Sequence, residues 1–207
     1  MNAKHSAISN SHVTPPELVE SVREVLGHID LDPCSTHLAN ARVVKSRVFY
    51  TESVNGFAQN WAGTAFFNPP GGWMDPKGIP APFVLDEKTG KFRQKKRAGD
   101  VYSPRAWFER LVKWHQRGNV KSWCFLAFSL EQLCTLQCIQ EPYPGVGAFT
   151  WVVLRERVKF LTEQDGQLVP GTSPTHHNAL VFSNDVNLRT LRRVFEKTGK
   201  GVVRRPA

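Results

Sequence analysis

Short apolar runs that stop at proline alternate along this sequence with longer segments of helical periodicity. Residues 29–32 run directly into Pro33, and residues 64–67 stop at Asn68-Pro69-Pro70. Proline has no backbone N–H and cannot continue a central strand ladder, so each run predicts a buried strand that ends in a rigid turn. Strands that alternate with helices indicate an α/β fold with a mostly parallel central sheet flanked by helices.

The remaining elements fit the same plan. Helical periodicity predicts helices at residues 15–26, 104–118, 131–140 and 187–198. Further apolar runs predict strands at residues 49–51, 120–128, 149–154, 157–161 and 179–182. Thr14 is expected to cap the first helix with its hydroxyl. Ligands of α/β folds bind at the carboxyl ends of strands, which is where Asp32-Pro33-Cys34 and Asn68-Pro69-Pro70 fall.

Length and composition favour one domain without a membrane segment. The chain has 207 residues, of which 41% are hydrophobic, enough for a substantial core. No apolar run reaches the roughly 20 residues that a spanning helix needs. The N-terminal residues lack the apolar stretch of a signal peptide, so a cytoplasmic protein is expected. The four cysteines lack the spacing of zinc ligands, so we interpret them as free thiols and expect no metal site.

Positive charge is concentrated in two segments. The chain carries 27 Lys and Arg against 18 Asp and Glu. Residues 71–100 hold seven basic and four acidic side chains, and residues 186–207 hold seven basic and one acidic side chain. The rest of the chain is balanced, with 13 basic and 13 acidic side chains. We interpret these segments as a basic loop insertion at about 71–103 and a basic C-terminal helix or tail at about 186–207. Both are suited to a polyanion, most simply nucleic acid. The alternative is a solubilising loop and a frayed tail.

The Asn-Pro-Pro turn has a definite chemical use. Its two prolines fix the backbone, so the Asn68 side-chain oxygen and the Pro69 carbonyl oxygen can both point outward. Two such acceptors can hold the two hydrogens of an aromatic amine. The amine lone pair then leaves ring conjugation, which makes the nitrogen a better nucleophile. The alternative is an ordinary turn, in which Asn is simply a favourable residue.

The order of several short motifs adds to this interpretation. Thr14-Pro15, Asp30-Leu31-Asp32-Pro33-Cys34 and Gly56-Phe57 precede Gln59, Trp61 and Asn68-Pro69-Pro70. In this order they resemble the phage-type DNA N-6-adenine methyltransferase family. The resemblance covers residues 12–70 well and residues 104–183 loosely. It implies a single domain with a Rossmann-like S-adenosylmethionine-dependent methyltransferase fold.

The resemblance also implies an activity and a set of site residues. The activity is methylation of the exocyclic amine of adenine in double-stranded DNA, as in phage or prophage restriction-modification, with S-adenosyl-L-methionine as cofactor. Asn68, Pro69 and Pro70 would be catalytic. The cofactor would be lined by Thr14, Pro15, Asp32, Pro33 and Cys34, with Glu52 as a ribose ligand. The candidate DNA-binding residues are Lys91, Arg93, Lys95, Lys96, Arg97, Arg192 and Arg193.

Two departures from the family pattern keep other functions open. No G-x-G motif follows Asp32, and Gly71 stands where the family has an aromatic residue after Asn-Pro-Pro. That aromatic residue would stack on the extruded base; Trp73 and Phe160 are the candidates to replace it. The alternatives are a methyltransferase acting on RNA or on protein glutamine, and a catalytically degenerate DNA-binding protein.

Overall fold

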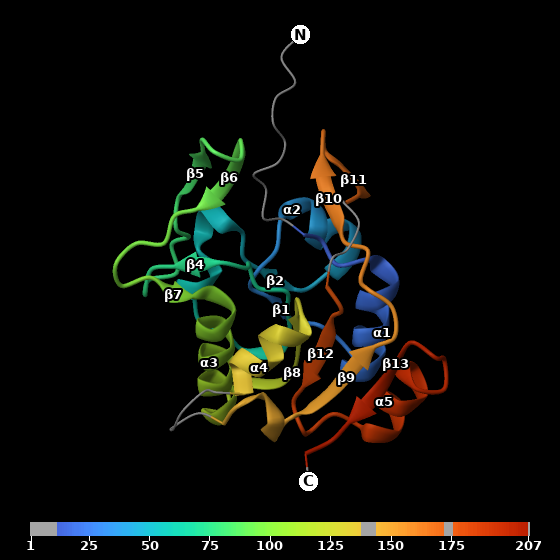
Figure 1. Ribbon diagram of the computed structural model, residues 1–207. Coiled ribbons are helices and arrows are strands. Elements are labelled where there is room, and N and C mark those ends of the chain that lie inside the picture. Colours follow the sequence, from blue (N-terminus) through green and yellow to red (C-terminus); the bar gives the residue numbers. More distant parts are fainter. Residues whose placement is uncertain (1–11, 138–143, 172–175, 207) are drawn as a thin grey trace.

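The core of the protein is a seven-stranded sheet of order β13-β9-β12-β8-β3-β1-β2 (Figure 1). The computed structural model describes residues 12–137, 144–171 and 176–206. The sheet strands are β1 (Leu31–Asp32), β2 (Val48–Phe49), β3 (Gly63–Phe67), β8 (Val120–Ala127), β9 (Thr150–Leu154), β12 (Ala179–Phe182) and β13 (Gly201–Arg204). The predicted α/β class is confirmed.

The sheet has a parallel half and an antiparallel half. β2, β1, β3 and β8 run parallel to one another. β12 enters between β8 and β9 in the opposite direction, and β13 pairs antiparallel with the outer edge of β9. The expectation of a mostly parallel sheet therefore holds for the first half of the chain only. The C-terminal segment is not only a helix and a tail, because it also supplies the edge strand.

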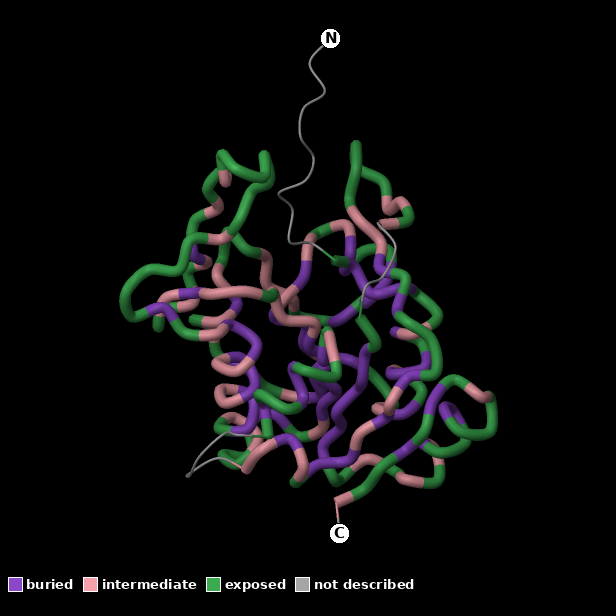
Figure 2. The backbone as a smooth tube through the Cα atoms, viewed as in Figure 1, coloured by how far each residue is buried: buried purple, intermediate pink, exposed green. Residues whose placement is uncertain are grey.

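Helices cover both faces of the sheet. One face carries α1 (Pro16–Leu26), α5 (Leu188–Phe195) and α2 (His37–Ala39), which continues into a π-helical turn; the other carries α3 (Ser103–Gln116) and α4 (Leu130–Gln137). Strand side chains alternate between the two layers: in β8, Leu126 packs with α1 and α5, whereas Phe125 packs with α3. Both faces of the sheet are thus buried under helices, and this burial explains the continuous apolar runs of the central strands (Figure 2).

Residues 71–103, expected as a basic loop insertion, contain two β-ribbons. β4 (Trp73–Met74) pairs with β7 (Val101–Tyr102), and β5 (Phe83–Asp86) pairs with β6 (Lys91–Gln94). A further hairpin, β10 (Leu161–Gln164) with β11 (Gln167–Pro170), follows β9. β3 and β9 end at the same edge of the sheet, so the β5–β6 and β10–β11 hairpins project from that edge, on either side of the β1 and β3 ends (Figure 1).

Two local expectations need correction. The residue that caps α1 is Pro15, and no side chain caps this helix, so Thr14 is not the N-cap. Only Leu161 of the predicted strand at 157–161 is in a strand. The predicted helix at 131–140 is present as α4 up to Gln137, and residues 138–140 lie outside the described part of the chain. No helix among the described residues is long and apolar enough to span a membrane.

Candidate functional site

The strand order reverses beside β1. After β1 the chain adds β2 on one side, then crosses to place β3 on the other side. Such a switch point leaves a crevice outside the carboxyl ends of the strands, where open α/β sheets bind ligands. Leu31 pairs with Ala65, so Cys34 and Asn68, each three residues further on, leave adjacent strands at the same level. The two turns that the sequence singles out therefore lie side by side at the carboxyl ends of β1 and β3.

The first turn buries a carboxylate. Asp32 is 3% exposed, and its Oδ1 accepts a hydrogen bond from the Cys34 backbone N–H at 3.1 Å. Burial raises the pKa of Asp32 to about 6 against the smaller opposing effect of the Cys34 hydrogen bond. Among the described residues no Lys, Arg or His forms an ion pair with it. Burial and the Asp32 charge raise the pKa of the Cys34 thiol, so this cysteine stays protonated.

The segment from Gly56 to Trp61 packs against this turn. A Cβ atom at Gly56 would lie 2.0 Å from the Pro33 carbonyl oxygen, so only glycine fits. Trp61 is fully buried and donates its indole N–H to the Gly56 carbonyl oxygen at 2.8 Å. Arg110 donates to the Gln59 carbonyl oxygen at 2.7 Å. Gly56, Gln59 and Trp61 thus hold the Pro33-Cys34 turn in place. The sequence does not predict that Arg110 of α3 supports this segment, because its local sequence pattern resembles that of any helix surface.

The second turn presents two free acceptors. Asn68 donates its side-chain Nδ2–H to the His12 carbonyl oxygen at 2.6 Å; the opposite amide orientation would set two oxygens at that distance, so Oδ1 points away from His12. Ser103 fixes the far end of the turn, its hydroxyl donating to the Pro70 carbonyl oxygen at 2.8 Å. Within the described part of the chain, nothing donates to Asn68 Oδ1 or to the Pro69 carbonyl oxygen.

The N-terminal segment pairs with the start of β10 and borders the Asn-Pro-Pro turn. Val13 exchanges two backbone hydrogen bonds with Leu161, at 2.9 and 2.8 Å. The His12 ring packs against Phe160 and Phe128, with centroids 5.7 and 6.0 Å apart, and burial lowers its pKa. The Thr14 hydroxyl is buried and has no hydrogen-bond partner among the described residues. The sequence predicts Thr14 for this site but not His12, whose polar surroundings in the chain carry no signal.

The other predicted cofactor residues lie near the same edge. Pro15 is buried and precedes α1. Glu52 is exposed and begins a short 3-10 turn after β2, the strand beside β1. The Ser35 backbone N–H donates to the Tyr50 carbonyl oxygen at 2.9 Å, and Tyr50 N–H donates to the Asp32 carbonyl oxygen at 3.0 Å. The loops after β1 and β2 are therefore joined, and Glu52 follows directly from this joined backbone.

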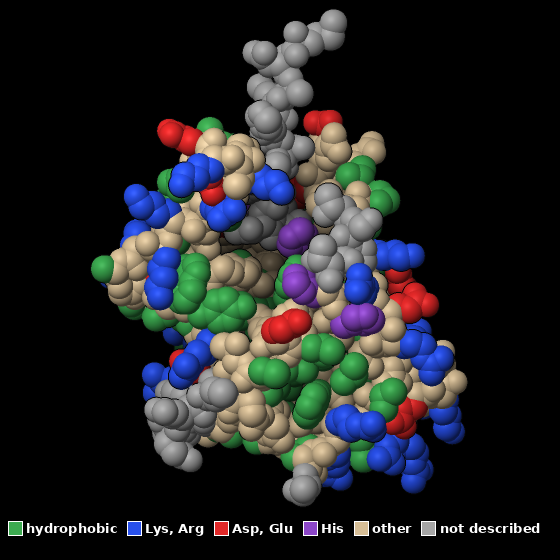
Figure 3. Space-filling view, viewed as in Figure 1, with side chains coloured by type: hydrophobic (Ala, Val, Ile, Leu, Met, Phe, Trp, Pro, Cys, Tyr) green, Lys and Arg blue, Asp and Glu red, His purple; other side chains and the backbone are tan. Residues whose placement is uncertain are grey.

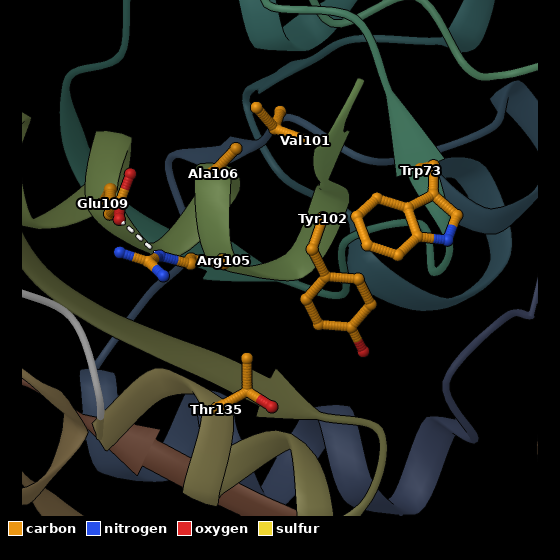
Figure 4. A pocket seen from close by; sticks show the side chains of 7 residues that line it. All are labelled: Trp73, Val101, Tyr102, Arg105, Ala106, Glu109 and Thr135. Atoms are coloured by element: carbon orange, nitrogen blue, oxygen red, sulfur yellow. Dashed lines mark hydrogen bonds and ion pairs between the residues drawn. The ribbon is translucent and has the colours of Figure 1, made fainter. Parts of the chain in front are cut away.

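Trp73 faces a separate pocket of about 640 Å³ (Figure 4). The pocket is lined by Trp73, Val101, Tyr102, Arg105, Ala106, Glu109 and Thr135. The Lys96 ammonium lies 3.8 Å from the centre of the Trp73 ring. The centroids of the Tyr102 and Trp73 rings are 5.7 Å apart. No residue of the Asn-Pro-Pro turn lines this pocket. Phe160 is 8% exposed, so neither aromatic residue predicted for base stacking presents an open face beside Asn68.

The predicted DNA-binding residues differ in how much charge they leave free. Arg97 pairs at 3.0 Å with the buried Asp100, and Arg93 pairs at 3.0 Å with Asp86. Arg193 pairs with Glu24 at 2.6 Å, and Arg192 lies 3.7 Å from Glu196. Lys91 and Lys95 are exposed, and among the described residues no carboxylate forms an ion pair with either. Among the predicted DNA-binding residues of the insertion, Lys91, Lys95 and Lys96 are therefore the ones whose charge is not offset by an ion pair with a described residue.

Comparison of the chain with protein-family models, with curated proteins and with solved structures finds no match. The assignment of a function therefore depends on the geometry of the chain itself.

Proposed function

We propose that the protein is an S-adenosylmethionine-dependent methyltransferase of Rossmann-like fold that methylates the exocyclic amine of adenine in DNA. The observation that carries this proposal is the pairing of two turns at one switch point. A buried carboxylate turn follows β1, and an Asn-Pro-Pro turn with two free acceptors follows the adjacent β3. The resemblance to phage-type adenine methyltransferases assigns a cofactor to the first turn and an amine to the second.

The first turn has the chemistry that the cofactor requires. S-adenosylmethionine carries an ammonium and a sulfonium group, and it supplies an electrophilic methyl group when bound. Asp32 is a buried carboxylate without a cationic partner among the described residues. The nearby N-terminal segment buries the Thr14 hydroxyl without a hydrogen-bond partner, and buried polar groups normally have one. Asp32 would pair with the ammonium and Thr14 would supply a hydroxyl contact; both would gain a partner on binding.

The second turn can prepare the amine for attack. Asn68 Oδ1 and the Pro69 carbonyl oxygen would each accept one amine hydrogen, so the nitrogen lone pair points away from the ring system. His12 and Ser103 fix the turn before the substrate arrives, so the acceptors need no reorganisation. The nitrogen forms a bond to the methyl carbon as the carbon–sulfur bond breaks. The nitrogen becomes cationic and then loses a proton to solvent, so no strong base is needed.

Charge and shape favour a nucleic acid as the substrate. The β5–β6 hairpin, with Lys91 on β6 and Lys95 just beyond it, begins shortly after the Asn-Pro-Pro turn and projects from the same edge of the sheet (Figure 1). Lysines that neutralise phosphates provide salt-dependent affinity for DNA. The hairpin is therefore placed to hold the backbone while the turn receives a base.

A single experiment separates this proposal from its alternatives. Unmethylated duplex DNA, RNA and a protein mixture are incubated with S-adenosylmethionine labelled in its methyl group. Wild-type protein should place the label in N-6-methyladenine, and Asn68→Ala should lower the rate about 100-fold or more, because a preorganised acceptor is lost. Label in RNA or in protein glutamine would favour the other methyltransferases, and DNA retention without transfer would favour the degenerate binding protein.

Asn119→Ala is the matched control. Asn119 is exposed and lies just before β8, at the opposite end of the parallel strands, and among the described residues only its backbone forms hydrogen bonds. This variant should transfer methyl groups at the wild-type rate. Equal losses in Asn68→Ala and Asn119→Ala would mean that the loss is not specific to the turn and would contradict the proposed role of Asn68.

A further inference from the structure

The proposed activity requires a surface on which the extruded base can stack, and the expected position does not provide one. Gly71 follows the Asn-Pro-Pro turn and has open space around it. Trp73 faces another pocket and has the Lys96 ammonium over its ring. An enzyme that acts on a base in duplex DNA must take it out of the stack and hold it by new contacts. The holding group must therefore come from another element.

Phe128 is an exposed ring at the end of the strand beside β3. It follows β8 directly and is 38% exposed, although most aromatic side chains of the core are fully buried. Its ring is nearly parallel to those of Phe160 and His12, at interplanar angles of 26° and 30° and with centroids 6.0 Å apart in each case. Phe160 and His12 thus pack against the Phe128 ring, and part of that side chain stays exposed.

This ring group is directly connected to the Asn-Pro-Pro turn. The His12 carbonyl oxygen accepts the hydrogen bond from Asn68 Nδ2, while the His12 ring contacts Phe128. Phe67 pairs with Phe125 in the parallel β3–β8 ladder, so Asn68 and Phe128 follow adjacent strands at nearby levels. Histidine side chains gather on this part of the surface (Figure 3), and His176 also contacts the Phe128 ring at 5.5 Å.

The backbone of Phe128 is fixed on both sides by buried side chains. Its N–H donates to Gln132 Oε1 at 2.6 Å, and its carbonyl oxygen accepts from Asn178 Nδ2 at 2.6 Å. Gln132 is 4% exposed and Asn178 is 1% exposed. An exposed aromatic ring on a backbone that is held this firmly is pre-organised to receive a planar ligand.

We propose that Phe128 is the stacking surface for the extruded adenine, and that it replaces the aromatic residue missing at Gly71. This proposal rests on the proposed function. The ligand is an unpaired purine whose face lies on the Phe128 ring while its amine reaches Asn68 Oδ1 and the Pro69 carbonyl oxygen. Phe128 is a positioning residue, because it holds the base rather than the reacting nitrogen.

The test compares binding of two single-stranded oligonucleotides that differ only at one position, an adenine in the first and an abasic residue in the second. Wild-type protein should bind the adenine form more tightly, and the ratio of dissociation constants measures the base contact. Phe128→Ala should reduce this ratio about 10-fold or more, since base–aromatic stacking has effects of that order. Phe128→Tyr, which keeps the ring, should restore it. A ratio unchanged in Phe128→Ala, or a wild-type protein without preference for the adenine form, overturns the proposal.

Two further measurements keep the outcomes separable. Val202→Ala truncates a side chain that is 41% exposed on the edge strand β13, and it should keep the wild-type ratio; a fall in this control as large as in Phe128→Ala overturns the proposal. Methyl transfer is measured in parallel on unmethylated duplex DNA. A Phe128-dependent ratio without transfer would refute the proposed function but support Phe128 as a base-binding residue. Transfer with an unchanged ratio in Phe128→Ala would support the function and refute the role of Phe128.

Discussion

Asp32 is a carboxylate in surroundings that favour its neutral form. Burial raises its pKa from an ordinary value of 3.8 to about 6. The unfolded chain releases this proton near pH 4, whereas the folded chain keeps it until about pH 6. The free energy of unfolding therefore falls as the pH rises from about 4 to about 6 and stays lower above that range. A pKa difference of about 2 corresponds to about 3 kcal/mol, which a bound cation would offset.

Replacing Asp32 by Asn should therefore stabilise the protein and weaken cofactor binding. The amide oxygen can still accept the Cys34 N–H, but no charge is buried. Urea unfolding should show Asp32→Asn to be about 2–3 kcal/mol more stable than wild type at pH 8, with little difference near pH 3.5. Cofactor affinity of the wild type should rise with pH through about 6, and that of the variant should not. A stability difference of the same size at both pH values would contradict this account.

Single residues were predictable from the sequence where their role depends on a turn. Asp32 and Asn68 stand at the ends of apolar runs, and that position is visible in the chain itself. His12 could not be found this way, because it is 56 residues from Asn68, the side chain that it orients. Phe128 ends a long apolar run, so the sequence predicts that it belongs to the core. The exposure of its ring depends on where the neighbouring elements end, which the sequence does not show.

At the scale of elements, one side chain attaches the β5–β6 hairpin to the rest of the protein. Gln94 accepts the Trp73 backbone N–H at 2.6 Å and donates to the Trp73 and Ala81 carbonyl oxygens at 2.9 and 3.0 Å. A Cβ atom at Gly72 would lie 2.0 Å from Gln94 Oε1, and Gly72 has φ +80°, so this contact also requires glycine. Isolated two-stranded hairpins are marginally stable, and this one depends on Gln94.

Gln94→Ala should loosen the hairpin without unfolding the domain. We expect faster limited proteolysis between residues 83 and 94, because three hydrogen bonds to the core side are lost, while the melting temperature changes little. Gln164→Ala, an exposed position on the other hairpin, is the control and should keep wild-type proteolysis in the 83–94 region. Cleavage sites that appear equally throughout the sheet strands would mean that Gln94 stabilises the whole domain.

Residues 157–160 and residues 71–103 depart from the predicted elements for a similar physical reason. Residues 157–160 alternate as a strand does, with Val158 and Phe160 buried. The Val158 N–H, however, donates to the Asn178 side chain at 2.9 Å instead of to a neighbouring strand. The insertion is ordered by Gln94 in the same way. In both segments a side chain more than ten residues away in sequence determines the backbone conformation. Hydrophobic periodicity cannot predict such a contact.

At the scale of the whole molecule, the two basic segments lie far apart. The β5–β6 hairpin projects from the edge that holds both turns, whereas α5 and β13 lie towards the other end of the molecule (Figure 1). Lys and Arg side chains gather in both regions (Figure 3). The sequence predicted which segments are basic but not that only one of them borders the site. In α5, Arg193 also has its charge offset by Glu24 of α1.

DNA affinity should therefore depend on the hairpin more than on α5. The double variant Lys91→Ala/Lys95→Ala removes two free charges, so the slope of log affinity against log salt should become about 1.8 less steep. Arg189→Ala/Arg192→Ala should change it by less than half as much. Fluorescence anisotropy with labelled duplex DNA measures both slopes. Cofactor affinity should stay unchanged, and an equal loss of it would show that the hairpin supports the fold rather than the DNA.

The pairing of the N-terminal segment with the start of β10 also governs when the protein can begin to work during its synthesis. The Asn-Pro-Pro turn leaves the ribosome early, but Leu161, which pairs with Val13, and Asn178, which fixes Phe128, follow about a hundred residues later. A nascent chain has the motif without the contacts that orient it, because contacts of such long sequence separation form last. A chain that stops before residue 161 therefore lacks both the Val13–Leu161 pairing and the Asn178 contact, so the candidate site can assemble only in a nearly finished chain.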